Sequence, residues 1–277
     1  MGRNISLMPE PTRPVAYLLD LDGTLYTGDA AVPGAPETLE HLRRHGVPFR
    51  LVTNTTSRSR AMLVERMRGY GFAVQPEEIF TATLAGAAVA RDSGMLLVAP
   101  FLPAPALEDL SGLELVGGTS GRGSPTGQTG GKPQAVILGD LGDAWGYGLL
   151  QEAFEYVMDG ATIIALSRDR YWRRGERLAL DAGPFVAALE YATGASAVIA
   201  GKPSPAFYAA ALVGLGVAGP AEAAMVGDDL WSDVEGAQRA GLQGWLVRTG
   251  KFRAEALRDS GITPNRVLPS VAALGRP

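Results

Sequence analysis

The sequence predicts an α/β fold built on a doubly wound parallel sheet, with a second α/β domain inserted into the first. Short apolar runs without alternation, such as VAYLLD (15–20) and AAMVGD (223–228), are typical of parallel strands covered on both faces. Helical patterns with recognisable ends lie between these runs. A segment rich in Gly, Ser and Thr, residues 117–133, interrupts a central block that has apolar runs and helical patterns of its own.

The apolar runs are expected to be the buried strands of this fold. Each is short and rich in Val, Ile and Leu, and turn residues or a helical pattern follow it. The nine expected strands are VAYLLD (15–20), PFRLVTN (48–54), MLLVAP (95–100), LELVG (113–117), QAVILGD (134–140), TIIALS (162–167), SAVIAG (196–201), AAMVGD (223–228) and GWLVRTG (244–250).

Three helices are expected from their end signals, at residues 57–69, 204–213 and 232–240. The first begins at serines. The second has Ser204 at the N-cap and Pro205 at the first helical position. The third begins with a Ser-x-x-Glu capping box from Ser232 to Glu235. Helices that alternate with apolar strands predict repeated strand-helix units.

The chain is therefore divided into two expected domains. Residues 1–80 and 197–277 form the core, and residues 81–196 form the inserted domain. We predict that the Gly/Ser/Thr-rich segment 117–133 is a mobile loop of the inserted domain, because almost nothing in it is apolar.

Composition narrows the chemistry. The chain has no cysteine, which excludes thiolate catalysis and Cys-ligated metal sites. It has only two histidines, which are too few for a His-rich metal site. A net charge of −4 argues against nucleic acid as a partner. The N-terminal residues show no signal-peptide pattern, and no apolar run reaches the length of a membrane span. We expect a cytoplasmic protein without a membrane partner.

Polar residues follow four of the apolar runs where each run ends. In an open parallel sheet, ligands bind beyond the carboxyl ends of the strands, so neighbouring strands would gather these residues in one site. The candidates are Asp20 and Asp22 after the first run, Thr53 and Asn54 after the second, Lys202 after SAVIAG, and Asp228, Asp229 and Asp233 after AAMVG.

This residue set suits phosphate chemistry. Crowded carboxylates repel one another, and a hard divalent cation relieves that repulsion. Oxygen ligands without imidazole or thiolate favour Mg²⁺ over zinc. The cation, Lys202, Thr53 and loop amides together form a receptor for a phosphate group. Asp20 can then attack phosphorus to form an aspartyl-phosphate, while Asp22 protonates the leaving oxygen and later activates water.

The four segments that carry these candidate residues closely resemble a known set of motifs. DLDGT (20–24), VTNTTS (52–57), GKPSP (201–205) and GDDLWSDVEGAQRAG (227–241) resemble the four motifs of the haloacid dehalogenase superfamily of phosphatases. The resemblance covers nearly the whole chain. It implies a Rossmann-like core shared by this superfamily, with an inserted cap domain of type IIA between the second and third motifs.

The resemblance also implies a role for each position. Asp20 is the nucleophile and a Mg²⁺ ligand, and Asp22 is the acid/base that gives its backbone carbonyl to the metal. Asp228 is the remaining protein ligand. The other implied roles are phosphate binding by Thr53, Asn54 and Lys202, and orientation of metal-bound water or Lys202 by Asp233.

Plain structural alternatives stay open at several of these positions. Asp22 begins a sequence that also suits a simple turn, and Asn54 suits the start of a loop. Asp233 lies in the first turn of an expected helix, where the macrodipole favours any acid. Asp229 is either an N-cap or a carboxylate just outside the metal site.

The inserted domain offers weaker candidates for contact with the organic part of a substrate. Arg168 and Asp169 lie in SRDRYWRRG (167–175), after the strand TIIALS, and Asp143 lies in GDLGDAWGYG (139–148). A solvated charged rim is an equal alternative for these residues. Nothing in the sequence selects a nucleotide, a sugar phosphate, a phospho-amino acid or pyrophosphate.

We therefore expect a Mg²⁺-dependent phosphatase that hydrolyses small phosphomonoesters through an aspartyl-phosphate. The inserted domain excludes bulky protein surfaces, so the expected partner is a small phosphorylated molecule. Two alternatives stay open. One is a phosphotransferase or mutase of the same superfamily, and the other is a catalytically weak protein that binds a phosphorylated ligand. A homodimer also stays open.

Overall fold

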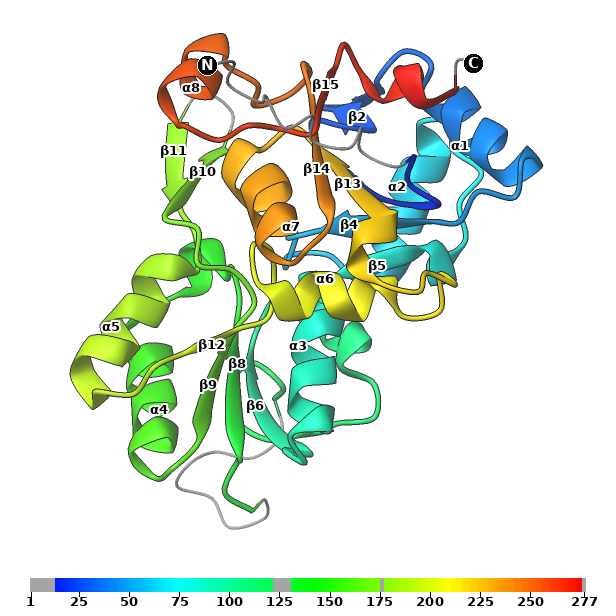
Figure 1. Cartoon of the computed structure of the whole chain (residues 1–277). Coiled ribbons are helices and arrows are strands. Elements are labelled where there is room, and N and C mark those ends of the chain that lie inside the picture. The colour runs from blue at the N-terminus through cyan, green and yellow to red at the C-terminus, as the bar shows by residue number, and fades with distance from the viewer. Residues whose placement is uncertain (1–12, 122–130, 175–176, 276–277) are drawn as a thin grey trace, which may run out of the picture.

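The computed structural model describes residues 13–121, 131–174 and 177–275. Residues 122–130, the middle of the segment that we predict to be a mobile loop, lie outside the described residues. Two parallel sheets dominate the structure, and in Figure 1 the smaller sheet lies below the larger one. This arrangement confirms the predicted α/β class and the doubly wound parallel sheet.

The larger sheet has six strands in the order β15-β14-β13-β1-β4-β5, and every neighbouring pair is parallel. Strand β1 is central, with β4 on one side and β13 on the other, so the carboxyl ends of these three strands lie at one edge of the sheet. The strands are β1 (Ala16–Asp20), β4 (Phe49–Thr53), β5 (Ile79–Thr81), β13 (Ala223–Gly227), β14 (Gln243–Val247) and β15 (Arg266–Leu268).

Helices cover both faces of this sheet (Figure 1). Apolar residues of α1 and α2 pack on one face, and those of α3, α6 and α7 pack on the other. The helices are α1 (Ala35–Arg44), α2 (Arg60–Gly69), α3 (Ala82–Asp92), α6 (Pro205–Leu212), α7 (Gly236–Arg239) and α8 (Ala254–Asp259). We call the sheet with α1, α2, α6, α7 and α8 the six-stranded unit.

The smaller sheet has five parallel strands in the order β12-β9-β8-β6-β7. Helices α4 and α5 pack on one face, and α3 packs on the other. The elements are β6 (Leu97–Phe101), β7 (Glu114–Leu115), β8 (Ala135–Leu138), β9 (Thr162–Ala165), β12 (Val198–Ile199), α4 (Tyr147–Met158) and α5 (Gly183–Thr193). We call this sheet with α4, α5 and the 3-10 helix Ala104–Leu110 the five-stranded unit.

One apolar core runs through both units. Leu18 and Met225 of the larger sheet belong to the same buried cluster as Ile137 and Ile164 of the smaller one. The residues that join them come from α6, which lies between the sheets in Figure 1, and from α3, which lies beside the smaller sheet. The predicted domain boundaries at 80/81 and 196/197 stay a prediction.

Short elements complete the described structure. Two antiparallel hairpins, which the apolar pattern does not predict, join β2 to β3 and β10 to β11. Their bounds are β2 (Tyr26–Thr27), β3 (Ala30–Ala31), β10 (Tyr171–Arg174) and β11 (Arg177–Leu180), and further 3-10 turns lie at Pro76–Glu78, Gly142–Ala144, Pro220–Glu222 and Val271–Gly275. Within the described ranges no helix is long and apolar enough to cross a membrane.

The structure corrects two local predictions. Strand β12 pairs with β9 in the smaller sheet, so the strand before Lys202 is not a neighbour of β1. The predicted capping box at Ser232 is also wrong. The helical segment begins earlier, because the Asp229 side chain accepts hydrogen bonds from the backbone N–H groups of Trp231 and Ser232. A π-helical stretch, Leu230–Glu235, then leads into α7.

Candidate active site

Three neighbouring strands of the larger sheet bring polar groups to one point. Asp20 is the last residue of β1, Thr53 is the last residue of β4, and Asp228 directly follows β13. Their exposed fractions are 7%, 3% and 3%. Buried carboxylates are costly unless they are paired, so this grouping points to a site rather than to packing.

Lys202 supplies the pairing charge from the segment after β12. Its ammonium donates to Oδ1 of Asp20 at 2.5 Å and to Oδ1 of Asp233 at 2.7 Å. The lysine is only 4% exposed, and Asp233 is 1% exposed. The two carboxylates hold the pKa of Lys202 well above its ordinary value despite its burial. Lys202 therefore remains a cation at the centre of the site.

The carboxylates nevertheless outnumber this cation. One carboxylate oxygen from each of Asp20, Asp228 and Asp233 lies within 4.8 Å of the others. Burial raises the pKa of Asp20 to about 7, with Asp233 adding to the shift and Lys202 opposing it. Burial and the charges of Asp20 and Asp233 raise the pKa of Asp228 to about 8. A further positive charge at this point would be strongly favoured.

The backbone around Asp228 leaves no room for other side chains. A Cβ added to Gly23 would lie 1.9 Å from Oδ2 of Asp228, and one added to Gly250 would lie 2.0 Å from the same atom. Both glycines have positive φ, +86° and +56°. The same carboxylate oxygen accepts a hydrogen bond from the backbone N–H of Lys251 at 2.6 Å. Two turns therefore clamp this carboxylate in one orientation.

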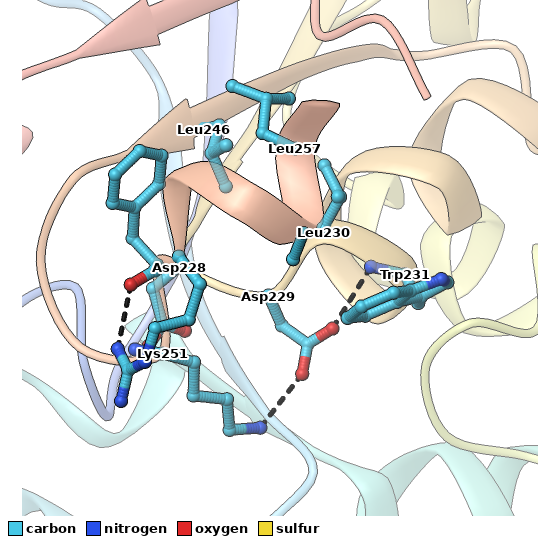
Figure 2. A pocket seen from close by; sticks show the side chains of 10 residues that line it. Asp228, Asp229, Leu230, Trp231, Leu246, Lys251 and Leu257 are labelled. Carbon is cyan, nitrogen blue, oxygen red and sulfur yellow. Dashed lines mark hydrogen bonds and ion pairs between the residues drawn. The ribbon is translucent and has the colours of Figure 1, made fainter. Parts of the chain in front are cut away.

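Asp229 connects this cluster to the surface. Its side chain caps the helical segment and accepts from the ammonium of Lys251 at 2.9 Å, as Figure 2 shows. Its backbone N–H donates to Oδ2 of Asp233 at 3.0 Å. The N-cap alternative for Asp229 is therefore correct, and the same residue also holds Asp233 in place for Lys202.

A small pocket beside these residues is mainly apolar. Figure 2 shows Leu230, Leu246 and Leu257 on the side of the pocket opposite the Asp229–Lys251 ion pair. Apolar walls lower the local dielectric, which strengthens the electrostatic interactions of the nearby charges.

The remaining core candidates lie close by. Asp22 has an exposed side chain in the turn after β1. The Asn54 side chain accepts from the backbone N–H of Lys202 at 2.8 Å and donates to its carbonyl at 2.9 Å. Both ends of this amide are thus used to hold the Lys202 segment. The predicted contact of Asn54 with phosphate stays a prediction, as does that of Thr53, whose hydroxyl bonds to Thr55.

The three candidates from the five-stranded unit are not equivalent. Arg168 pairs with Glu190 of α5 at 2.5 Å. Asp143 is exposed in the 3-10 turn that follows β8. Desolvation raises the pKa of Asp169, and the charges of Lys251, Asp229 and Lys202 act on it as well. Asp169 is therefore within electrostatic reach of Lys202, Asp229 and Lys251.

Gly23, Gly250 and Lys251 have no role that the sequence alone predicts. A signal for the last two is present in VRTGKF (247–252), because this segment follows the carboxyl end of the buried strand β14. Their contacts with Asp228 become apparent only when β14 is placed beside β13.

Comparison with known proteins places the chain in a family of hydrolases. Residues 17–101 match the family model described as haloacid dehalogenase-like hydrolase, and residues 199–274 match a second model of HAD-hydrolase-like proteins. Human haloacid dehalogenase-like hydrolase domain-containing protein 2 is 43% identical over 86% of this chain and 86% of its own length. Human phospholysine phosphohistidine inorganic pyrophosphate phosphatase is 35% identical over 85% and 83%.

Solved structures show the same architecture. A p-nitrophenyl phosphatase from Archaeoglobus fulgidus superposes with a TM-score of 0.83 at 27% identity, covering 95% of this chain and 98% of that one. A glycerol phosphate phosphatase from Mycobacterium tuberculosis, solved in complex with magnesium, has a TM-score of 0.79 at 28% identity, covering 95% and 76%.

The chain belongs to the haloacid dehalogenase-like hydrolases, and it is an enzyme of the hydrolase class whose named relatives include several phosphatases. The family resemblance predicted from the four motifs is therefore confirmed.

Proposed function

We propose that the protein is a Mg²⁺-dependent phosphatase that hydrolyses small phosphomonoesters through an aspartyl-phosphate. The observation that carries this proposal is the contact of Lys202 with Asp20 inside a buried cluster of carboxylates. A carboxylate nucleophile and a phosphate dianion repel each other. A fixed ammonium beside the nucleophile reduces that repulsion and also positions the attacking oxygen.

The residues of the chain account for both halves of the reaction. A carboxylate oxygen of Asp20 attacks phosphorus, and the bond to the leaving oxygen breaks as Asp22 gives that oxygen a proton. Asp22, now ionised, takes a proton from water, and the water oxygen attacks the aspartyl-phosphate. Phosphate leaves and the Asp20 carboxylate is restored. The exposed position of Asp22 suits exchange with substrate and water.

The donor set fits Mg²⁺. The clustered oxygens of Asp20, Asp228 and Asp233 are hard ligands. Burial and neighbouring carboxylates raise the pKa values of Asp20 and Asp228, and a bound cation would offset both effects. Asp20 and Asp228 would hold the ion together with the backbone carbonyl of Asp22, while Asp233 stays engaged with Lys202. The bound ion would neutralise charge on the phosphate group. A magnesium complex of a similar phosphatase supports this choice.

We also propose that the five-stranded unit acts as a cap over the site. The hydrogen bonds of Asp140 with Thr56 and of Asp109 with Arg60, which join this unit to the segment after β4, support this role. A cap restricts access, so small phosphorylated molecules are the expected substrates, and folded phosphoproteins are not.

The test is hydrolysis of p-nitrophenyl phosphate by purified protein with Mg²⁺, with a chelator, and by the variant Asp20→Asn. Turnover that requires both the metal and Asp20 is the expected result. A folded, Mg²⁺-loaded protein that releases no phosphate, or turnover that survives chelation, contradicts the proposal. Transfer of the phosphate to an added alcohol or sugar in place of water would identify a phosphotransferase.

A further inference from the structure

The segment that would face the phosphate is long and has little regular structure. We call residues 53–59 the phosphate loop. It runs from Thr53, at the end of β4, to Ser59, the N-cap of α2. Within the loop, the Thr53 hydroxyl accepts from the backbone N–H of Thr55 at 3.1 Å. The contacts that hold the rest of the loop come from outside it.

The middle of the phosphate loop is held by the five-stranded unit. Thr56 is 4% exposed, and its hydroxyl oxygen accepts a hydrogen bond from the backbone N–H of Asp140 at 3.0 Å. Asp140 lies in the turn after β8. The preceding residue, Gly139, permits the close approach, because an added Cβ would lie 3.0 Å from Cβ of Thr56 and 3.1 Å from its hydroxyl oxygen.

The far end of the loop is held by a buried carboxylate of the same unit. Asp109, in the 3-10 helix Ala104–Leu110, is 6% exposed. Its two oxygens lie 3.0 and 3.3 Å from the backbone nitrogen of Arg60, the first residue of α2. It also accepts from the hydroxyl of Thr81 at 3.3 Å. Thr81 pairs with Thr53 across β5 and β4, so Asp109 connects both ends of the loop.

We propose that Thr56 and Asp109 are positioning residues, through which the five-stranded unit holds the phosphate loop in its phosphate-binding conformation. This inference rests on the proposed function and adds a long-range control to the same site. Loop amides bind an anion tightly only if their geometry is set beforehand, because ordering a free loop costs conformational entropy at each binding event. Neither residue touches the substrate in this role.

The role makes a specific kinetic prediction. A loosened phosphate loop weakens binding of the ester and of inorganic phosphate alike. The Asp20–Lys202 pair is untouched, so the chemical step is largely retained. We therefore expect KM for the ester and the inhibition constant of phosphate to rise together, while kcat changes little.

The chain offers closely matched variants for the test. Thr56→Val keeps the shape of the side chain and removes the hydroxyl oxygen, whereas Thr56→Ser keeps that oxygen. Thr83→Val is the control. Thr83 is also fully buried, and its hydroxyl has no hydrogen-bond partner within the described part of the chain. Asp109→Asn tests the second contact while nearly preserving the volume of the side chain.

The experiment measures p-nitrophenyl phosphate kinetics, phosphate inhibition and calorimetric binding of inorganic phosphate, with thermal unfolding as a check on folding. For Thr56→Val we expect KM and the phosphate inhibition constant to rise about tenfold, as for one lost hydrogen bond, with kcat within about threefold. Asp109→Asn should shift the same two constants. Thr56→Ser and Thr83→Val should behave like the wild type.

Three outcomes overturn the inference. They are a fall in kcat with unchanged KM and phosphate affinity, equal effects in Thr56→Val and Thr83→Val, and failure of Thr56→Ser to restore phosphate binding. Calorimetry separates this inference from the proposed function. A wild type that binds phosphate without hydrolysing the ester contradicts the function alone, and the variants still decide the inference by binding. A folded wild type that does neither contradicts both.

Discussion

The two parallel sheets place the same residue types at the carboxyl ends of their strands but bury them to different extents. In the six-stranded unit, Asp20 and Asp228 are 7% and 3% exposed. In the five-stranded unit, Asp140 is half-buried after β8, and Asp169 is exposed after β9. The two sheets are similar in topology, so the difference lies in what surrounds the carboxylates.

The surroundings of the six-stranded unit make a buried cluster tolerable. Lys202 neutralises part of the charge, and the absence of side chains at Gly23 and Gly250 leaves space for Asp228. Among the residues described, the five-stranded unit has no comparable buried cation, and the carboxylates that follow β8 and β9, Asp140 and Asp169, stay nearer to water. A carboxylate at the end of a strand has a perturbed pKa when it is both buried and paired with another charge. The position at a strand end, which both sheets share, is not sufficient.

Removal of the buried cation should have the largest effect. In Lys202→Met, Asp20 and Asp233 lose their shared partner, and breaking one side of a buried pair typically costs about 3–5 kcal/mol. Turnover of p-nitrophenyl phosphate should fall by at least about 10²-fold, because the charge beside the nucleophile is lost. Urea unfolding and steady-state kinetics measure the two effects.

The matched control lies in the five-stranded unit. Lys132 pairs with Asp159 at 2.9 Å, with side chains 76% and 55% exposed. Lys132→Met should cost less than about 1 kcal/mol and leave turnover unchanged. Similar losses in the two variants would show that burial does not distinguish the two sites.

Adding a methyl group beside Asp228 should have the next largest effect. In Gly23→Ala, the new Cβ would displace the Asp228 carboxylate, so weaker activation by Mg²⁺ and a fall in kcat of about 10²-fold are expected. Gly28→Ala is the control, because Gly28 also has positive φ but has no atom within 4 Å of an added Cβ. Both variants carry the backbone strain of about 1–2 kcal/mol, so their difference isolates the contact with Asp228. Equal Mg²⁺ dependence in both would refute that contact.

The pH dependence of stability should reveal the partly buried carboxylate of Asp181, which follows β11. Burial, aided by the charges of Asp169 and Asp140, raises the pKa of Asp181 to about 6 from an ordinary 3.8. The folded protein thus retains a proton that the unfolded chain releases. The stability that this difference contributes is present below pH 3.8 and is lost as the pH rises through about 6.

Asp181→Asn cannot ionise and should escape this loss. The unfolding free energy of the variant minus that of the wild type should therefore increase by roughly 1–2 kcal/mol from pH 4.5 to pH 7. Urea midpoints at the two pH values measure the change. A difference between variant and wild type that is constant with pH would be inconsistent with a raised pKa at this position.

The smallest effect is expected at Arg168. Its guanidinium pairs with Glu190, and its side chain is 53% exposed. Arg168→Ala should change stability by less than about 1 kcal/mol and leave KM within about twofold of the wild type. Asp169→Asn is the comparison, because the field of Lys251 and Lys202 reaches Asp169, and a larger change of KM is expected there. A strong effect of Arg168→Ala alone would restore Arg168 as a substrate contact.

Much of the fold could be predicted because its signals are local. Buried parallel strands require continuous apolar runs, and all nine predicted runs contain strands. Ser59 and Ser204 lie at helix N-caps as their sequences indicate. The hairpin of β10 and β11 could not be predicted in this way, because it is exposed on the surface and lacks a buried apolar pattern.

The sequence by itself determined nine of the strands, the family and the order of the candidate site residues, because each depends on short patterns along the chain. Only the tertiary structure decided that β12 joins the other sheet, that Asp140 bonds to Thr56 of the phosphate loop, and that Asp109 bonds to Arg60 at the end of that loop. The bonded partners at Asp109–Arg60, Thr56–Asp140 and Asp20–Lys202 are 49, 84 and 182 residues apart. Contacts of this kind arise from packing of the two sheets against shared helices, and no local pattern records that packing.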